Sequence, residues 1–249
     1  MADGPYALTH SPGIFFEGQA SISGAPLFAR LRLEITAGAW TCLLGGSGVG
    51  KSTILRLIAG LETGASFDGA ITASDGQDVQ SRVAYMAQDD LLLPWATAAE
   101  NVALGARLRG QSPDTDRETR LLDRSGLSEH AEKRKDQLSG GQRQRVALAR
   151  TLMEDKPIIL LDEPFSALDA KTRSEMHELA AELLPGRTVL MVTHDPAEAA
   201  RLGHSIAILA PGGMEHFDPP SSEIPRPLDA IETLQCQADL MRTLREPAA

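Results

Sequence analysis

The glycine-rich stretch GGSGVGKS constrains the fold of this chain more than any other feature of its sequence. It lies between an apolar run, WTCLL, and a segment, STILRLIAGL, whose apolar residues recur at helical spacing. Glycines let consecutive backbone N–H groups turn toward a phosphate, and the N-terminus of the following helix adds its dipole. The stretch fits the pattern GxxxxGK[ST] and predicts a nucleotide-phosphate loop in an α/β protein.

The residue types in this loop have separate chemical tasks. Lys51 places a positive charge at the β- and γ-phosphates, and Ser52 offers a hydroxyl to Mg²⁺. The alternative is a glycine-rich turn without a ligand, but the strand before it and the helix after it are the context that a phosphate loop requires. We predict that the nucleotide is held by Gly45, Gly46, Ser47, Gly48, Val49, Gly50, Lys51, Ser52 and Thr53.

A second motif places two acids, Asp162 and Glu163, at the end of the apolar run IILL. Ligands of open α/β sheets bind at the edge where the carboxyl ends of the strands lie. We predict that Asp162 holds Mg²⁺ through water, while Glu163 points elsewhere because side chains alternate along a strand. Glu163 can then polarise a water molecule. The alternative is a pair of solvated acids in a loop.

Three further residues are weak indicators when each is taken alone. Gln88 follows the strand-like run VAYMA, where a glutamine is usually a surface residue. His194 follows TVLMVT, and Asp195 and Pro196 after it predict a helix start with a capping aspartate and a first-turn proline. Asp169 lies just past the two acids, where a helix cap or a turn is the usual role.

The stretch LSGGQRQRVALAR has a second set of features that suit an anion. Ser139 and Gln142 form a capping box ahead of an apolar-periodic run, which predicts a well-capped helix. That interpretation leaves Gly140 and Gly141 unexplained, because glycine in a first turn weakens a helix. Paired glycines make sense if something approaches the backbone closely. Since the first loop already wraps the chain's own nucleotide, we predict that this stretch serves a nucleotide on another copy in a two-fold dimer.

Strand-like runs alternate with helical segments over most of the chain. Apolar runs at 157–162, 188–194 and 205–210 predict strands separated by helices, and hence a largely parallel sheet. Residues 91–135 differ, because their pattern is mostly helical with Arg and Glu faces. From Pro211 the chain is rich in proline and then ends in a short amphipathic run.

Composition disfavours several classes of protein. The chain has 249 residues and a formal net charge of −10, whereas nucleic-acid binding requires a basic face. We assign the short basic runs at 133–135 and 143–145 to solvated helix faces. Cys42 and Cys236 are too few and too far apart for a disulfide framework, so we expect a reducing compartment. No apolar run reaches the ~18–20 residues that cross a bilayer, and no signal peptide is expected.

Taken in order, these motifs resemble those of the ATP-binding cassette ATPases. LSGGQ resembles the signature of that family, Gln88 its Q-loop, and Asp169 with the preceding Ser-Ala-Leu its D-loop, while His194 resembles its switch histidine. The resemblance implies an α/β, RecA-like P-loop core with an antiparallel β-subdomain and an inserted α-helical subdomain. The expected division is a core of 1–88 and 151–228, a helical signature subdomain of 89–150, and a C-terminal helix and tail of 229–249.

The resemblance also implies an ATPase that uses ATP and Mg²⁺ and closes as a homodimer around two nucleotides. Glu163 would act as the base, His194 would contact the γ-phosphate, and Gln88 would join Ser52 and Asp162 at the metal. The nucleotide of the partner copy would be contacted by Ser139, Gly140, Gly141, Gln142 and Asp169.

One departure from the family pattern concerns the adenine base. The family usually has an aromatic residue upstream of the phosphate loop, which stacks on adenine. The corresponding region here reads QASISGAPLF, and Phe15, Phe16 and Phe28 do not match that position. Two alternatives stay open: loose base selectivity, or an aliphatic residue such as Ile22 in this place.

The segment DLLLPWATAAENVALG and the tail IPRPLD resemble cassette subunits of nitrate, sulfonate and taurine importers, a group that includes importers of thiamine-precursor pyrimidines. We predict that a groove near Leu92, Pro94 and Trp95 receives a cytoplasmic helix of a transmembrane permease, since aromatic anchors are common hot spots. The alternative is that Trp95 and the leucines pack inside the helical subdomain. The implied complex has two copies of this chain, two permease copies and a periplasmic solute-binding protein, on the cytoplasmic side of the inner membrane.

Two other functions compete with this interpretation. Soluble cassette ATPases of DNA repair or translation resemble tandem cassettes or carry long coiled-coil insertions, and this chain has neither. An unrelated P-loop kinase or GTPase is disfavoured by LSGGQ and His194. No nucleic-acid partner is therefore expected.

Overall fold

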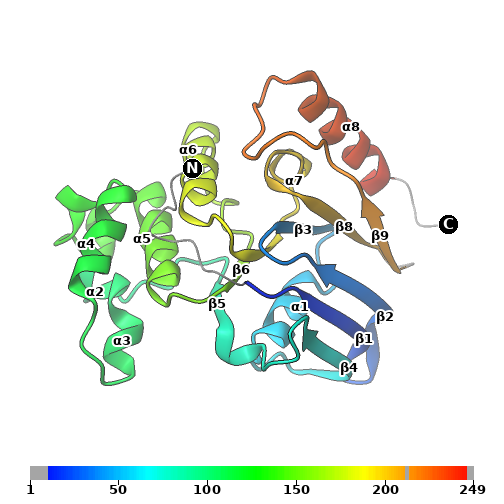
Figure 1. Ribbon diagram of the computed structural model, residues 1–249, viewed down its shortest axis with the longest axis horizontal. Coiled ribbons are helices and arrows are strands. Elements are labelled where there is room, and N and C mark those ends of the chain that lie inside the picture. Colours follow the sequence, from blue (N-terminus) through cyan, green and yellow to red (C-terminus); the bar gives the residue numbers. More distant parts are fainter. Residues whose placement is uncertain (1–10, 211–212, 246–249) are drawn as a thin grey trace.

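The computed structural model describes residues 11–210 and 213–245, which form two β-sheets with helices packed on them (Figure 1). The larger sheet has the strand order β5 (Val83–Met86), β6 (Ile158–Asp162), β7 (Thr188–Val192), β3 (Trp40–Gly45), β8 (Ser205–Ala210) and β9 (Gly213–Phe217). Its first five strands are parallel, and β9 pairs antiparallel with β8 at one edge. The predicted, largely parallel sheet is confirmed, and β9 adds an edge strand that the sequence analysis missed.

The central strands β3, β6 and β7 are buried along their whole length. Their sequences are continuous apolar runs because protein covers both faces of a parallel sheet. Successive residues face opposite cores: Cys42 and Leu44 pack on one side of β3, and Leu43 packs on the other. Cys42 and Cys236 are both free and buried, and burial raises the pKa of each thiol.

The smaller sheet is antiparallel, with the order β2 (Ala25–Ile35), β1 (Ile14–Ile22) and β4 (Ala65–Ala73). Ser23 and Gly24 join β1 to β2, both with positive φ, as tight hairpin turns require. Helix α1 (Lys51–Ile58) lies between the two sheets, because Ile54, Leu55 and Ile58 share one core with both. The expected antiparallel β-subdomain is confirmed.

Helices α6 (Ala170–Leu183), α7 (Pro196–Leu202) and α8 (Ile231–Arg245) cover the other face of the parallel sheet (Figure 1). A second group of helices lies beyond β5, at the left of that view. It consists of α2 (Ala98–Val102), α3 (Leu104–Leu108), α4 (Thr115–Arg124) and α5 (Gly140–Met153), with 3₁₀ turns at Ser128–His130 and Lys135–Gln137; a further 3₁₀ turn, Gln80–Arg82, precedes β5.

Helix α5 joins this group to the core. Its apolar face buries Val146, Ala149, Leu152 and Met153, which belong to the apolar-periodic run predicted after Ser139 and Gln142. Across 11–210 and 213–245, none of the helices combines the length and the apolar character needed to span a bilayer.

Candidate functional site

The glycine-rich loop connects β3 to α1 at the carboxyl edge of the parallel sheet. Gly50 precedes the helix with a φ of 103°, and a Cβ there would lie 2.8 Å from the Phe28 ring, so the position requires glycine. The ammonium group of Lys51 donates to the carbonyls of Gly45 and Gly46, each at 2.8 Å. Burial lowers the pKa of Lys51, and the negative charges of Glu163 and Asp162 oppose this shift.

Asp162 ends β6 in the same corner and is buried. Its Oδ1 accepts a hydrogen bond from the Ser52 hydroxyl at 2.8 Å, and its Oδ2 accepts one from the Tyr85 hydroxyl at 3.0 Å. Burial raises the pKa of Tyr85, so the phenol keeps its proton and remains a donor. The sequence analysis missed Tyr85, which belongs to no motif. The only sequence signal was its hydroxyl group in the otherwise apolar strand β5.

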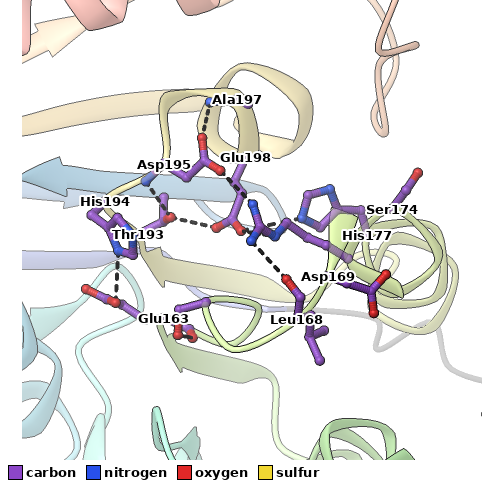
Figure 2. Close-up of polar contacts among 12 residues, drawn as sticks. Glu163, Leu168, Asp169, Ser174, His177, Thr193, His194, Asp195, Ala197 and Glu198 are labelled. Carbon is purple, nitrogen blue, oxygen red and sulfur yellow. Dashed lines mark hydrogen bonds and ion pairs between the residues drawn. The ribbon is translucent and has the colours of Figure 1, made fainter. Parts of the chain in front are cut away.

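Glu163 follows with a φ of 46°, in the left-handed region that few residues other than glycine adopt. Its backbone N–H donates to the carbonyl of Val192 at 2.9 Å, which fixes the turn against β7. Its Oε2 accepts a hydrogen bond from Gln88 Nε2 at 3.3 Å. The same oxygen lies 2.9 Å from His194 Nδ1 (Figure 2). Three residues from the ends of adjacent strands β5, β6 and β7 therefore meet at one carboxylate.

A pocket of about 530 Å³ opens over these groups. It is lined by Ile22, Leu27, Ser47, Gly48, Gly50, Lys51, Ser52, Thr53, Gln88, Glu163 and His194. No aromatic side chain is among these lining residues. Phe16 and Phe28 are buried in the core, whereas Ile22 lines the pocket, which favours the aliphatic alternative for the base-binding position.

The signature residues lie outside this pocket. Ser139 caps α5: its hydroxyl accepts from the Gln142 N–H at 3.2 Å, and Gln142 Oε1 accepts from the Ser139 N–H at 2.9 Å. The predicted capping box is confirmed. Asp169 also lies outside the pocket and caps α6, where its hydrogen bond with the Thr172 hydroxyl lowers the pKa of Asp169. Neither segment therefore lines the pocket over the chain's own phosphate loop.

A residue of the same chain approaches one of the paired glycines. A Cβ at Gly141 would lie 2.4 Å from Thr172 Cγ2, so the contact between α5 and α6 requires glycine at this position. A Cβ at Gly140 would meet nothing closer than the Arg143 side chain at 3.8 Å. Packing against α6 therefore accounts for the glycine at position 141, and the contact of this segment with a partner's nucleotide stays a prediction.

Asp90, two residues after Gln88, binds residues of the two basic runs at 133–135 and 143–145, which the sequence analysis assigns to solvated helix faces. Its carboxylate accepts from Lys135 Nζ at 2.6 Å and from Arg143 Nε at 3.0 Å. Arg150 also donates to the Asp90 backbone carbonyl at 2.6 Å. The earlier assignment is wrong for Lys135 and Arg143, because a partly buried carboxylate gathers charged partners from the turn before α5 and from α5 itself.

The segment after Gln88, expected to form a docking groove, is exposed at only some of the predicted residues. Trp95 is 69% exposed, and Leu91 and Pro94 are exposed beside it. Leu92 is 4% exposed and packs in the core, which corrects its assignment to a docking groove. Leu91, immediately before it, has a φ of 46°.

Comparison with known proteins places this site in a family context. The sequence model of the family described as "ABC transporter" matches residues 28–166. An uncharacterized ABC transporter ATP-binding protein of Haemophilus influenzae is 47% identical over 191 residues, covering 76% of this chain and 78% of that protein. The aliphatic sulfonates import ATP-binding protein SsuB of Escherichia coli K12 is 40% identical over 223 residues, covering 87% and 84%.

Solved structures give a similar result. A bacterial Atm1-family ABC exporter with ATP bound superimposes with a TM-score of 0.72 at 25% sequence identity. The match covers 97% of this chain and 42% of the exporter chain. The likeness therefore extends over nearly the whole of the present chain.

Proposed function

The chain belongs to the ABC transporter family, and we propose that it powers uptake of a small solute as the ATP-hydrolysing subunit of an importer. As a member of this family it binds ATP and is an ATPase with an α/β P-loop fold. The observation that carries the proposal is the meeting of Gln88, Glu163 and His194 beside the loop of Lys51 and Ser52.

We assign phosphate binding to residues 45–53. The Lys51 ammonium group already lies over the loop on two backbone carbonyls and can exchange these for phosphate oxygens. Ser52 and Asp162 would hold Mg²⁺, with Gln88 nearby, and the ion would neutralise charge on the β- and γ-phosphates. A hydroxyl and a carboxylate suit Mg²⁺, which keeps several waters and takes phosphate oxygens instead of a full protein cage.

We assign the role of general base to Glu163. A carboxylate at the strand edge accepts a proton from the attacking water, and Gln88 and His194 hold it in place. With Nδ1 at Glu163, the other ring nitrogen of His194 can contact the γ-phosphate. The residues 139–142 and Asp169 lie outside this pocket, which supports contact with the nucleotide of a partner copy in a closed homodimer.

The relatives' names support the transported class. Two of them, in Escherichia coli and Agrobacterium fabrum, are named as aliphatic sulfonates import ATP-binding proteins. We propose an organic anion of this type, carried by two permease copies and delivered by a periplasmic solute-binding protein. This chain would sit peripherally on the cytoplasmic side of the inner membrane, with 89–150 as the part that meets the permease.

Copurification and transport test this function together. The chain should be recovered with a permease from detergent-solubilised membranes, and the reconstituted complex should take up aliphatic sulfonates in an ATP-dependent way. Recovery on ribosomes or DNA, without a membrane partner, would support the soluble cassette alternative and contradict the proposal.

Trp95 provides the test of the docking surface. Trp95→Ala should weaken permease binding and sulfonate uptake, because an exposed aromatic anchor is lost, while the ATPase rate of the purified subunit persists. Ile231→Ala is the matched control, since Ile231 is 74% exposed on α8, away from this segment. Unchanged uptake by the Trp95 variant, or an equal loss in the control, would contradict the docking role.

A further inference from the structure

The guanidinium group of Arg173, in the first turn of α6, connects the loop that follows Glu163 with the loop of His194, and Glu163 and His194 themselves line the nucleotide pocket. Its Nη2 donates to the backbone carbonyl of Leu168 at 3.0 Å, and its Nη1 donates to Asp195 Oδ2 at 3.1 Å. Leu168 immediately precedes Asp169, and Asp195 immediately follows His194. Figure 2 shows Leu168 and Asp169 on the loop that faces the loop of Thr193, His194 and Asp195.

The loop of His194 is held from a second direction by Glu198. Glu198 Oε2 accepts from the Thr193 hydroxyl at 2.6 Å, and the same hydroxyl accepts from the Asp195 N–H at 3.0 Å. Glu198 Oε1 lies 3.7 Å from Arg173 Nε. The residues before and after His194 are therefore both tied, directly or through Glu198, to one guanidinium group.

Burial makes this network sensitive to the loss of its cation. Glu198 is 3% exposed, and Arg173 and Asp195 are half-buried beside a cavity of about 160 Å³. Charged hydrogen bonds in such surroundings are stronger than in water, and an unpaired partner is costly. Without the guanidinium group, Asp195 would keep its N-cap bond from the Ala197 N–H and lose its charged partner. The loop that places His194 Nδ1 2.9 Å from Glu163 would then be held less firmly.

We propose that Arg173 is a positioning residue that sets the His194 ring against Glu163 and couples it to the loop that ends at Asp169. Arg173 does not line the nucleotide pocket, so it acts through its neighbours and not on ATP. Through this coupling, a movement of His194 in the pocket would change the position of the loop that ends at Asp169, which is expected to face the partner copy. This inference rests on the roles proposed for Glu163 and His194.

Steady-state kinetics separate positioning from binding. Arg173→Ala should lower kcat about 10- to 100-fold, as small misplacements of reacting groups do, and leave ATP affinity within about threefold. Arg173→Lys should recover part of the loss, because one ammonium group can hold Asp195 or the Leu168 carbonyl but not both in the same fork. Glu182→Ala, which removes an exposed ion pair with Arg124 near the end of α6, is the control and should turn over at the wild-type rate.

A double-mutant cycle tests the route. If Arg173 acts through His194, Arg173→Ala should change kcat by less than about twofold in a His194→Ala background. The same fold loss in both backgrounds, or wild-type kcat in the Arg173→Ala variant, overturns the inference alone. Wild-type kcat in the His194→Ala variant overturns the role proposed for His194 and this inference with it.

A second variant keeps the test decisive if Arg173→Ala does not fold. Asp195→Asn preserves the N-cap of α7, because asparagine caps as well as aspartate, and removes the charge that Arg173 binds. Its kcat should fall several-fold with ATP affinity unchanged. Wild-type kcat in Asp195→Asn, with the melting temperature also unchanged, contradicts the coupling.

Discussion

Glu163 shows how much of the candidate chemistry depends on the backbone of one residue. Its φ of 46° turns the chain just after β6, so that Asp162 meets Ser52 while the next carboxylate meets Gln88 and His194. Such conformations cost energy and cluster at functional sites. Two adjacent acids thereby acquire different partners and different proposed tasks.

Glu163→Gln should leave ATP binding intact and slow hydrolysis by about 10²–10⁴, the usual loss when a general base is removed. Glutamine has the same shape and keeps an oxygen for Gln88 and His194, so the pocket is preserved. The measurements are ATPase rate and nucleotide affinity. Glu62→Gln, at an exposed acid after α1, is the control; a wild-type rate in the Glu163 variant would rule out the assignment.

At this scale the sequence predicts residues whose spacing forms a motif. Lys51, Ser52 and Asp162 are examples, and the resemblance adds Gln88 and His194. Tyr85 and Arg173 could not be predicted in this way, because neither belongs to a motif and their sequence neighbours do not indicate a function. Tyr85 donates to Asp162, which lies 77 positions further along the chain. The partners of Arg173, Leu168 and Asp195, come close to it only when their loops pack against α6.

Among the elements, the contact between α5 and α6 depends on one missing side chain. Thr172 Cγ2 fills the place that a Cβ of Gly141 would take, while the Thr172 hydroxyl donates to Asp169 at 2.7 Å. The start of α5 is thereby packed against the capped start of α6. Ser139 and Asp169 are the N-caps of these two helices, so the packing sets their relative position.

Gly141→Ala should destabilise the chain by roughly 1–3 kcal/mol, because a methyl group is forced into an occupied site. Urea unfolding without nucleotide measures this. Thr172→Ser, which removes the methyl group and keeps the hydroxyl for Asp169, should rescue the alanine variant in the double mutant. Gly140→Ala is the matched control, since a Cβ there has space; equal destabilisation by both single variants would contradict the packing argument.

Element prediction succeeded where burial imposes a pattern and failed where it does not. The strands β3, β6, β7 and β8 are apolar runs because both faces of the sheet are covered. The edge strand β9 has two exposed residues in its five, Glu215 and His216, and forms by pairing with β8, so its sequence carries little signal. The assignment of the basic runs to solvated faces was wrong because their partner Asp90 is distant in sequence and comes close only through tertiary packing.

At the scale of the whole molecule, the two segments proposed to bind nucleotide, the phosphate loop and residues 139–142, do not line the same pocket. The phosphate loop opens into its own pocket, and the segment 139–142 lies outside that pocket. A two-fold, head-to-tail pair would place each segment 139–142 over the other chain's loop. This arrangement predicts that defects in the two parts complement each other across a dimer.

Ser139→Arg and Lys51→Ala should each abolish ATPase activity when assayed alone, and Ser139→Arg should leave the ATP affinity of the isolated monomer nearly unchanged. A 1:1 mixture should recover about a quarter of the wild-type activity, since half of randomly mixed dimers are heterodimers with one intact site of two. Nucleotide affinity, thermal denaturation and ATPase rate against mixing ratio are the measurements, because the Ser139 variant also loses a helix cap worth about 1 kcal/mol. Mixing Ser139→Arg with a chain that carries both substitutions is the control, because every site then keeps a defect and no activity should return. No recovery in the mixture of the two single variants, or a loss of ATP affinity in the Ser139→Arg monomer equal to its loss of activity, would contradict contact with the partner's nucleotide.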